Sequence, residues 1–142
     1  MERTIFYSEI PSSTEALRPT VESAVATLVA YGWIDAERVF YAHLCLEEAL
    51  VNAITHGNQF EEERKVRLQI QEFNDHCIFR IWDEGKGFHV DAVDPPDDKA
   101  LGGRGICLIK HCMEDVAYDN DEHCLVMKMK RKAWSKGVSS HE

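Results

Sequence analysis

Two short segments of this chain combine carboxylate, carboxamide and glycine residues at spacings that suit nucleotide chemistry. Residues 48–58 read EALVNAITHGN, so Glu48 and Asn52 stand one helical turn apart. Residues 83–88 read DEGKGF, with Asp83 ahead of two glycines. We interpret the two segments together as a site for a purine nucleotide and a divalent metal ion.

The first segment belongs to a helical pattern. Leu44, Glu48, Asn52 and His56 follow at four-residue steps and form one stripe. A carboxamide oxygen is a suitable ligand for Mg²⁺. A carboxylate one turn away can accept a proton from a hydroxyl or a water bound near that metal. A solvated stripe, with Glu48 paired to a nearby basic residue, is the structural alternative.

Asp83 in the second segment follows an apolar strand expected at residues 78–82. Its carboxylate only accepts hydrogen bonds, so it suits the amino group of adenine and would repel the carbonyl of guanine. Gly85 and Gly87 let the backbone pass close to a flat ring. The alternative is a simple glycine turn.

A third glycine-rich segment, GGRG at residues 102–105, opens a helix expected at residues 106–113. Amides at a helix N-terminus attract phosphate, and Arg104 could add a charge-assisted hydrogen bond. The segment lacks the Gly-Lys-Ser/Thr of a P-loop and follows no βαβ strand, so neither of those fingerprints is present. A glycine-rich cap without a ligand is the alternative.

Length and composition set the context for these motifs. The 142 residues fit one domain, and the net charge of −9 argues against direct nucleic-acid binding, although it could attract a basic protein. We find no membrane span and no signal peptide, and we expect a cytoplasmic protein. The five cysteines match neither a zinc site nor a disulfide framework, so we expect inert core thiols.

The apolar pattern predicts the elements that position the motifs. We expect a capping box at residues 12–15 before the first helix, and Pro19 should kink that helix or mark its true start. Asp35 is the expected N-cap of a second helix that runs to Gly57, with an apolar side made of Phe40, Leu44, Leu50, Val51 and Ile54. We expect strands at residues 4–10, 66–71, 78–82, 116–118 and 123–130, and a mobile loop at residues 89–101. These elements predict an α+β fold, a two-layer sandwich with helices on one face of a mainly antiparallel mixed sheet.

In order and spacing, the three motifs resemble the N, G1 and G2 boxes of the GHKL (histidine kinase-like) ATPase superfamily, which has a Bergerat-type ATP-binding fold. The resemblance spans about residues 4–130. We expect the ATPase domain at residues 1–133 and a polar tail at residues 134–142. Within the superfamily, the chain is most similar to bacterial anti-sigma factor serine/threonine kinases, which are small stand-alone domains.

The resemblance implies a role for each matching residue. Asn52 would hold Mg²⁺, Glu48 would be the general base, and Asp83 would contact the adenine amino group. The remaining nucleotide contacts would come from Gly85 and Gly87 beside the ring and from Gly103, Arg104 and Gly105 at the phosphates. The loop at residues 89–101 would be the ATP lid.

The function that this resemblance implies is an ATP-dependent protein serine/threonine kinase that also acts as an anti-sigma factor. Its substrate would be an anti-sigma factor antagonist of the STAS class, and it would sequester a sigma factor, often as a homodimer. One alternative is a non-catalytic, nucleotide-gated module that binds a protein partner. Another is a structural domain without a ligand.

Overall fold

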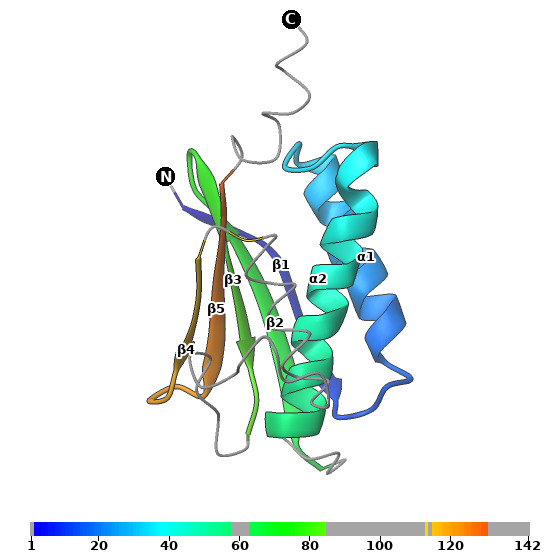
Figure 1. Ribbon diagram of the computed structural model, residues 1–142, viewed down its shortest axis with the longest axis vertical. Coiled ribbons are helices and arrows are strands. Elements are labelled where there is room, and N and C mark those ends of the chain that lie inside the picture. Colours follow the sequence, from blue (N-terminus) through cyan, green and yellow to red (C-terminus); the bar gives the residue numbers. More distant parts are fainter. Residues whose placement is uncertain (1, 58–62, 85–112, 114, 131–142) are drawn as a thin grey trace, which may run out of the picture.

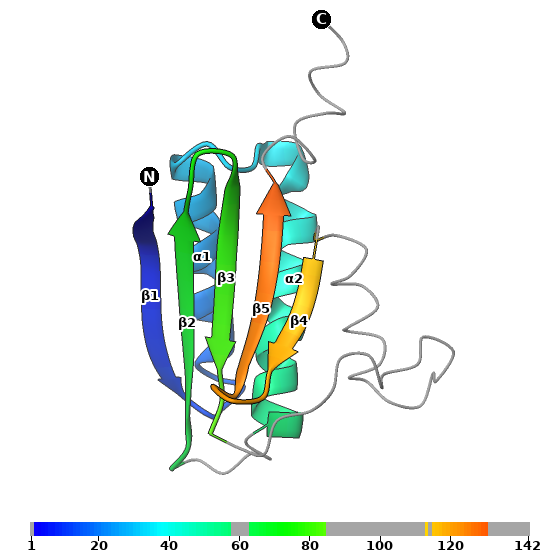
Figure 2. The same ribbon diagram turned by 90° about the vertical axis from the view of Figure 1, so that its left-hand side faces the viewer.

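The computed structural model describes residues 2–57, 63–84, 113 and 115–130, which form two layers. One layer is a five-stranded sheet and the other is a pair of helices that cover one face of it (Figure 1). Figure 2 looks onto the sheet with both helices behind it. The predicted α+β sandwich is therefore confirmed. Every strand pairing in the described part of the chain is antiparallel.

The elements occur in the predicted order, with bounds as follows: β1 (Arg3–Pro11), α1 (Leu17–Ala30), a 3₁₀ turn (Ala36–Arg38), α2 (Val39–Asn52), a π turn (Ala53–Gly57), β2 (Lys65–Glu72), β3 (His76–Trp82), β4 (Asp115–Asp119) and β5 (Cys124–Lys130). The strand order across the sheet is β1-β2-β3-β5-β4. The strands β1 and β4 are therefore the two edges, and β5 separates β4 from β3. The helix expected at residues 106–113 and the loop at residues 89–101 fall outside the described residues, apart from Met113.

The sheet turns one apolar face toward the helices. On β2, Val66, Leu68 and Ile70 are buried and alternate with more exposed polar residues. On β3, Cys77, Phe79 and Ile81 are buried in the same alternating way. Because neighbouring side chains of a strand point to opposite faces, this alternation assigns each of these residues to the face that the helices cover.

The helix α1 begins later than its sequence signal indicates. The expected capping box is wrong, because the N-cap is Ala16 and no side chain caps it. Instead, Ser13 Oγ accepts a 3.1 Å hydrogen bond from the backbone N–H of Glu15 in a turn before the helix. Pro19 is the third helical residue, where the backbone N–H would have no intrahelical partner. Pro19 therefore marks the true start of α1 rather than a kink.

The second predicted helix is divided into three parts. Asp35 caps the 3₁₀ turn as expected, since its Oδ1 accepts a 3.1 Å hydrogen bond from the N–H of Arg38. Leu50 and Ile54 are fully buried, as predicted. Phe40 is 67% exposed, so its assignment to the core was wrong, and Leu44 and Val51 are only half-buried. Four-residue steps advance by about 40° around a helix, so the stripe that begins at exposed Phe40 turns gradually toward the core and is buried at Asn52.

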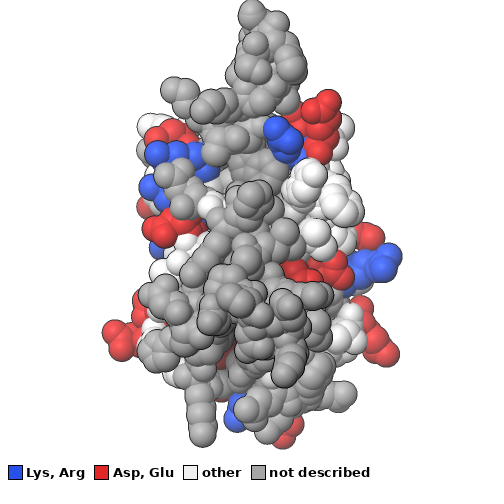
Figure 3. Space-filling view, in the orientation of Figure 1, with Lys and Arg blue, Asp and Glu red and all other residues white. Residues whose placement is uncertain are grey.

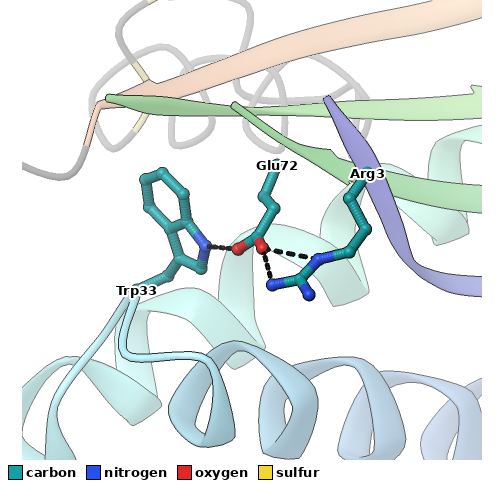
Figure 4. Close-up of polar contacts among 3 residues, drawn as sticks. All are labelled: Arg3, Trp33 and Glu72. Carbon is teal, nitrogen blue, oxygen red and sulfur yellow. Dashed lines mark hydrogen bonds and ion pairs between the residues drawn. The ribbon is translucent and has the colours of Figure 1, made fainter. Parts of the chain in front are cut away.

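Trp33, in the connection between the helices, is joined to the sheet by a partly buried polar contact (Figure 4). Its indole N–H donates a 2.7 Å hydrogen bond to Oε1 of Glu72, the last residue of β2. The other carboxylate oxygen of Glu72 accepts hydrogen bonds from the guanidinium of Arg3 on β1. Burial of the Trp33 indole is thus compatible with its polar N–H, because Glu72 satisfies it.

Three of the five cysteines lie in the described part, and all three are buried thiols: Cys45, Cys77 and Cys124. The expectation of core thiols is confirmed for these three, and the other two lie outside the described residues. Among the helices that the structure describes, none is long and apolar enough to cross a membrane.

Candidate active site

Asn52 lies where α2 ends and the backbone changes its winding. It is the last α-helical residue, and the chain continues into the π turn. The backbone N–H of Ala53 donates to the carbonyls of both Ala49 and Leu50. The Asn52 side chain is 2% exposed, at a position that the helix otherwise fills with apolar core residues. π turns are rare in proteins, and those that do occur lie frequently at functional sites. This end of α2 is therefore a candidate functional site.

The amide group of Asn52 is buried without satisfying its hydrogen-bonding capacity. Among the described residues, Nδ2 has no hydrogen-bond partner. A buried polar group left unpaired costs about 1–3 kcal/mol, so a bound group would relieve this cost. As placed, Nδ2 can donate to a phosphate oxygen, and a half-turn of the carboxamide would present Oδ1 to a cation instead.

The Asn52 carboxamide fits the requirements of Mg²⁺. This ion takes oxygen ligands and is usually held by one or two protein groups together with phosphates and waters. Within the described ranges, no group of three or more His, Cys, Asp or Glu side chains is arranged to hold a metal. A nucleotide-bound Mg²⁺ needs no such group, so one amide oxygen is a sufficient protein contribution.

Glu48 lies one turn before Asn52 on α2 and is half-buried. Its pKa is raised above the ordinary 4.5, mainly because burial disfavours the charged carboxylate and also because the charge of Glu47 repels it. A general base works best when its pKa lies near the working pH, so a raised value suits that role.

Asp83 follows directly after β3 and is 5% exposed. It continues the alternation of Cys77, Phe79 and Ile81, so its side chain lies on the face of the sheet that the helices cover. Two described residues, His123 and Tyr118, contact it. Its backbone N–H donates to the carbonyl oxygen of His123 at 3.0 Å, and its Oδ2 accepts from the Tyr118 hydroxyl at 2.8 Å.

The fold brings these polar positions to one end of the molecule. The C-terminal end of α2 and the C-terminal end of β3 both lie at the lower end in Figures 1 and 2. Asn52 is the last residue of α2 and Asp83 directly follows β3, and both side chains are buried between the layers. The Asn52 amide, which suits a metal ion, and the Asp83 carboxylate, which can accept a hydrogen bond from a nucleobase, therefore lie at the same end of the space between the layers.

The sequence profile of the histidine kinase-like ATPase domain matches residues 10–130 of this chain. The chain belongs to the histidine kinase-like ATPase family. The match begins at the end of β1 and ends with β5, so it includes both helices and all of the candidate site. Membership of this ATPase family implies that the domain binds ATP.

Two relatives of this histidine kinase-like ATPase are named as protein kinases. Serine-protein kinase RsbW of Oceanobacillus iheyensis is 25% identical, over 76% of this chain and 73% of the relative. Serine/threonine-protein kinase BtrW of Bordetella bronchiseptica is 27% identical, over 75% of this chain and 85% of the relative. The predicted resemblance is thus confirmed: the family model shows a histidine kinase-like ATPase, and both relatives are named as serine or serine/threonine kinases.

The remaining predicted positions of this ATPase domain lie outside the described residues. They are Gly85, Gly87, Gly103, Arg104 and Gly105. The side chain of His56 is also outside, although its backbone forms part of the π turn. Their roles stay predictions, as do the assigned roles of Glu48, Asn52 and Asp83.

Among the described residues, Tyr118 belongs to the candidate site although the sequence pattern did not predict it. It was assigned only to a strand, and its contact with Asp83 crosses an intervening strand. The one sequence signal is weak. Tyr118 shares the inward side of β4 with Val116, and a half-buried tyrosine usually finds a partner for its hydroxyl.

Proposed function

We propose that this protein is an ATP-dependent protein serine/threonine kinase. The observation that carries the proposal is the burial of Asn52 and Asp83 between the layers at one end of the fold, with Glu48 one turn from Asn52. Core positions normally hold apolar side chains, and polar residues there need partners. A nucleotide with its metal ion would supply a partner for the Asn52 amide. The adenine amino group would be a further donor to the Asp83 carboxylate, which already accepts a hydrogen bond from Tyr118.

The role that we propose for each side chain follows from its chemistry. The Asp83 carboxylate accepts a hydrogen bond from the amino group of adenine, and Asn52 provides an oxygen ligand for Mg²⁺. When bound, Mg²⁺ would neutralise charge on the phosphates. Glu48 accepts the proton of the attacking serine or threonine hydroxyl. Phosphoryl transfer requires mainly positioning and charge stabilisation, so few protein groups are needed.

The proposed substrate is an anti-sigma factor antagonist of the STAS class, and the proposed second partner is a sigma factor that the protein sequesters. The kinase names of the two relatives support a protein substrate. Exposed apolar side chains support protein binding, and four of the largest lie on or between the helices: Val29, Tyr31, Phe40 and Tyr41. In Figure 3 the helix side of the molecule, on the right, has uncharged surface bordered by charged side chains of both signs. A cytoplasmic location and a homodimer also belong to this proposal.

Phosphate transfer to a purified STAS-domain antagonist tests the kinase proposal. With radiolabelled Mg·ATP, we expect the wild type to label a serine or threonine of the antagonist. Glu48→Gln should retain Mg·ATP binding but lose transfer by about 10²–10⁴-fold, the usual contribution of a general base. Glu47→Gln, one position away on the same helix, is the matched control and should label the antagonist at the wild-type rate at pH 8.

Two results would contradict the proposal. Failure of the wild type to transfer phosphate to an antagonist that it binds would favour a non-catalytic, nucleotide-gated module. In that case Glu48→Gln would leave nucleotide-dependent partner binding unchanged. Failure of the wild type to bind Mg·ATP at all would leave only a structural domain.

A further inference from the structure

The edge strand β4 reaches Asp83 through one side chain. The hydroxyl of Tyr118 donates a 2.8 Å hydrogen bond to Oδ2 of Asp83. Tyr118 pairs with Leu125 on β5, whereas Asp83 follows β3 on the other side of β5. Strands two positions apart are separated by roughly 10 Å, twice the usual spacing. The phenol therefore bridges β5 and makes β4 part of the candidate site.

The backbone of Asp83 is held by the same hairpin. Its N–H donates to the carbonyl oxygen of His123, the residue just before β5. His123 has φ of 55°, in the left-handed region that non-glycine residues seldom adopt. Such a conformation persists only where its surroundings hold it, and it occurs often at binding sites. The β4–β5 hairpin thus fixes both the main chain and the carboxylate of Asp83.

We propose that Tyr118 is a positioning residue that fixes the orientation of the Asp83 carboxylate and so sets the preference of this site for purines with a 6-amino group. The proposal rests on the nucleotide-binding function proposed above. The Tyr118 ring is half-buried beside the Asp83 carboxylate, so the phenol and carboxylate form a preformed pair.

The selectivity follows from preorganisation. A carboxylate that rotates freely must lose that freedom when it binds an amino group, and water competes for its oxygens. A carboxylate that Tyr118 already holds loses less rotational freedom when it binds the amino group. It still repels a carbonyl at the position of that amino group. Sites built to hydrogen-bond a ligand group reject analogues that lack it.

Tyr118 remains a hydrogen-bond donor over the pH range in which the protein works. Its pKa is raised above the ordinary 10, first by burial and then by the hydrogen bond to Asp83 and the charge of that carboxylate. The phenol therefore stays protonated, and the contact does not depend on pH near neutrality.

Titration calorimetry with two nucleotides in the presence of Mg²⁺ tests the inference. The probes are ATP and purine riboside triphosphate, which lacks the 6-amino group. In Tyr118→Phe, which removes one oxygen atom, we expect ATP affinity to fall about tenfold, or about 1.4 kcal/mol. Affinity for the analogue should change by less than about twofold, so the preference for ATP is lost. If Tyr118 had a purely structural role, Tyr118→Phe would lower the affinity for both nucleotides by the same factor.

The chain offers a matched control on the opposite edge of the sheet. Tyr7 on β1 is 53% exposed, and Tyr7→Phe should leave both affinities unchanged. In an Asp83→Asn background, where the carboxylate is already absent, Tyr118→Phe should cause no further loss of preference for ATP.

The possible failures are distinguishable. If the wild type prefers ATP and Tyr118→Phe retains that preference, the role of Tyr118 is wrong while nucleotide binding stands. If Tyr118→Phe lowers the affinities for ATP and for the analogue by the same factor, Tyr118 acts only through packing and the inference is also wrong. If the wild type binds neither nucleotide, the proposed function itself fails.

Discussion

The indole N–H of Trp33 lies 2.7 Å from Oε1 of Glu72 and joins the helical layer to the sheet. This contact lies at the upper end of the molecule in Figure 1, where β2 ends and the helices connect, opposite to the candidate active site. Arg3 donates hydrogen bonds to the second carboxylate oxygen of Glu72, and its guanidinium carbon lies 5.2 Å from the centre of the Tyr31 ring. Stability and nucleotide binding can therefore be perturbed separately in this fold.

Removal of the Glu72 side chain should destabilise the protein without altering its site. In Glu72→Ala the indole N–H of Trp33, a residue only 1% exposed, loses its hydrogen bond to the Glu72 carboxylate. We expect the free energy of unfolding to fall by about 1–3 kcal/mol. Urea denaturation measures this loss, and Mg·ATP affinity should stay unchanged. Glu72→Gln keeps an acceptor for the indole and should lose less, so equal losses in the two variants would contradict the role of this hydrogen bond.

Replacement of Asn52 should have the opposite effect: the protein should become more stable but lose its binding of Mg·ATP. Asn52→Leu keeps the branching at Cγ and removes an amide whose Nδ2 has no partner in the described part of the chain. We expect unfolding to become less favourable by up to about 1–3 kcal/mol, while Mg²⁺-dependent ATP binding is lost. Thermal unfolding without nucleotide and calorimetry with Mg·ATP measure the two effects. A variant that binds Mg·ATP as tightly as the wild type would contradict the proposed role of Asn52.

The sequence predicted the strands well because their signal is local. Alternation of buried and polar residues on β2 and β3 identified the core face directly. The same pattern, extended by one residue, places Asp83 on that face, so this site position could be predicted in principle. Asn52 was identified by its residue type and spacing, and its burial agrees with a functional role.

The parts that were mispredicted depend on geometry that a linear pattern does not contain. The long second helix was expected as one regular element, but it changes from 3₁₀ to α to π winding. Phe40 was assigned to the core because it fits helical spacing, yet it lies on the outer surface at 67% exposure. Tyr118 was missed because its contact with Asp83 depends on a strand order that only the folded sheet defines.

The buried cysteines should be poor targets for thiol reagents. Cys124 is 1% exposed, and its pKa is raised to about 12, mainly by burial. Since the thiolate is the reactive form, we expect Cys45, Cys77 and Cys124 to remain unmodified by iodoacetamide at pH 8 in the native state. Peptide mapping by mass spectrometry, with a urea-unfolded sample as the control, measures the protection. Rapid native labelling of Cys124 would contradict the close packing around it.

The burial of Glu48 should make part of the protein's stability depend on pH. Its pKa is higher in the folded state than the 4.5 expected when unfolded. Between these two values the folded state binds more protons, so the contribution of Glu48 to stability decreases as pH rises through that window. Glu48→Gln cannot ionise and should be more stable than the wild type at pH 7 but equally stable near pH 3.5. Urea denaturation at both pH values measures the difference, and an equal difference at the two would contradict the raised pKa.

The same shift should be visible in the kinase reaction, with Glu47 as its modulator. A general base acts when deprotonated, so the rate should decrease below the raised pKa of Glu48. Glu47 raises that pKa by charge repulsion, after burial, so Glu47→Gln should move the acid limb of the pH–rate profile to lower pH. The rate on the plateau above the acid limb should stay the same, because Glu48 is ionised there in both proteins. Single-turnover labelling from pH 4.5 to 8 measures the profile. An acid limb that stays in place in Glu47→Gln would show that the titrating group is not Glu48.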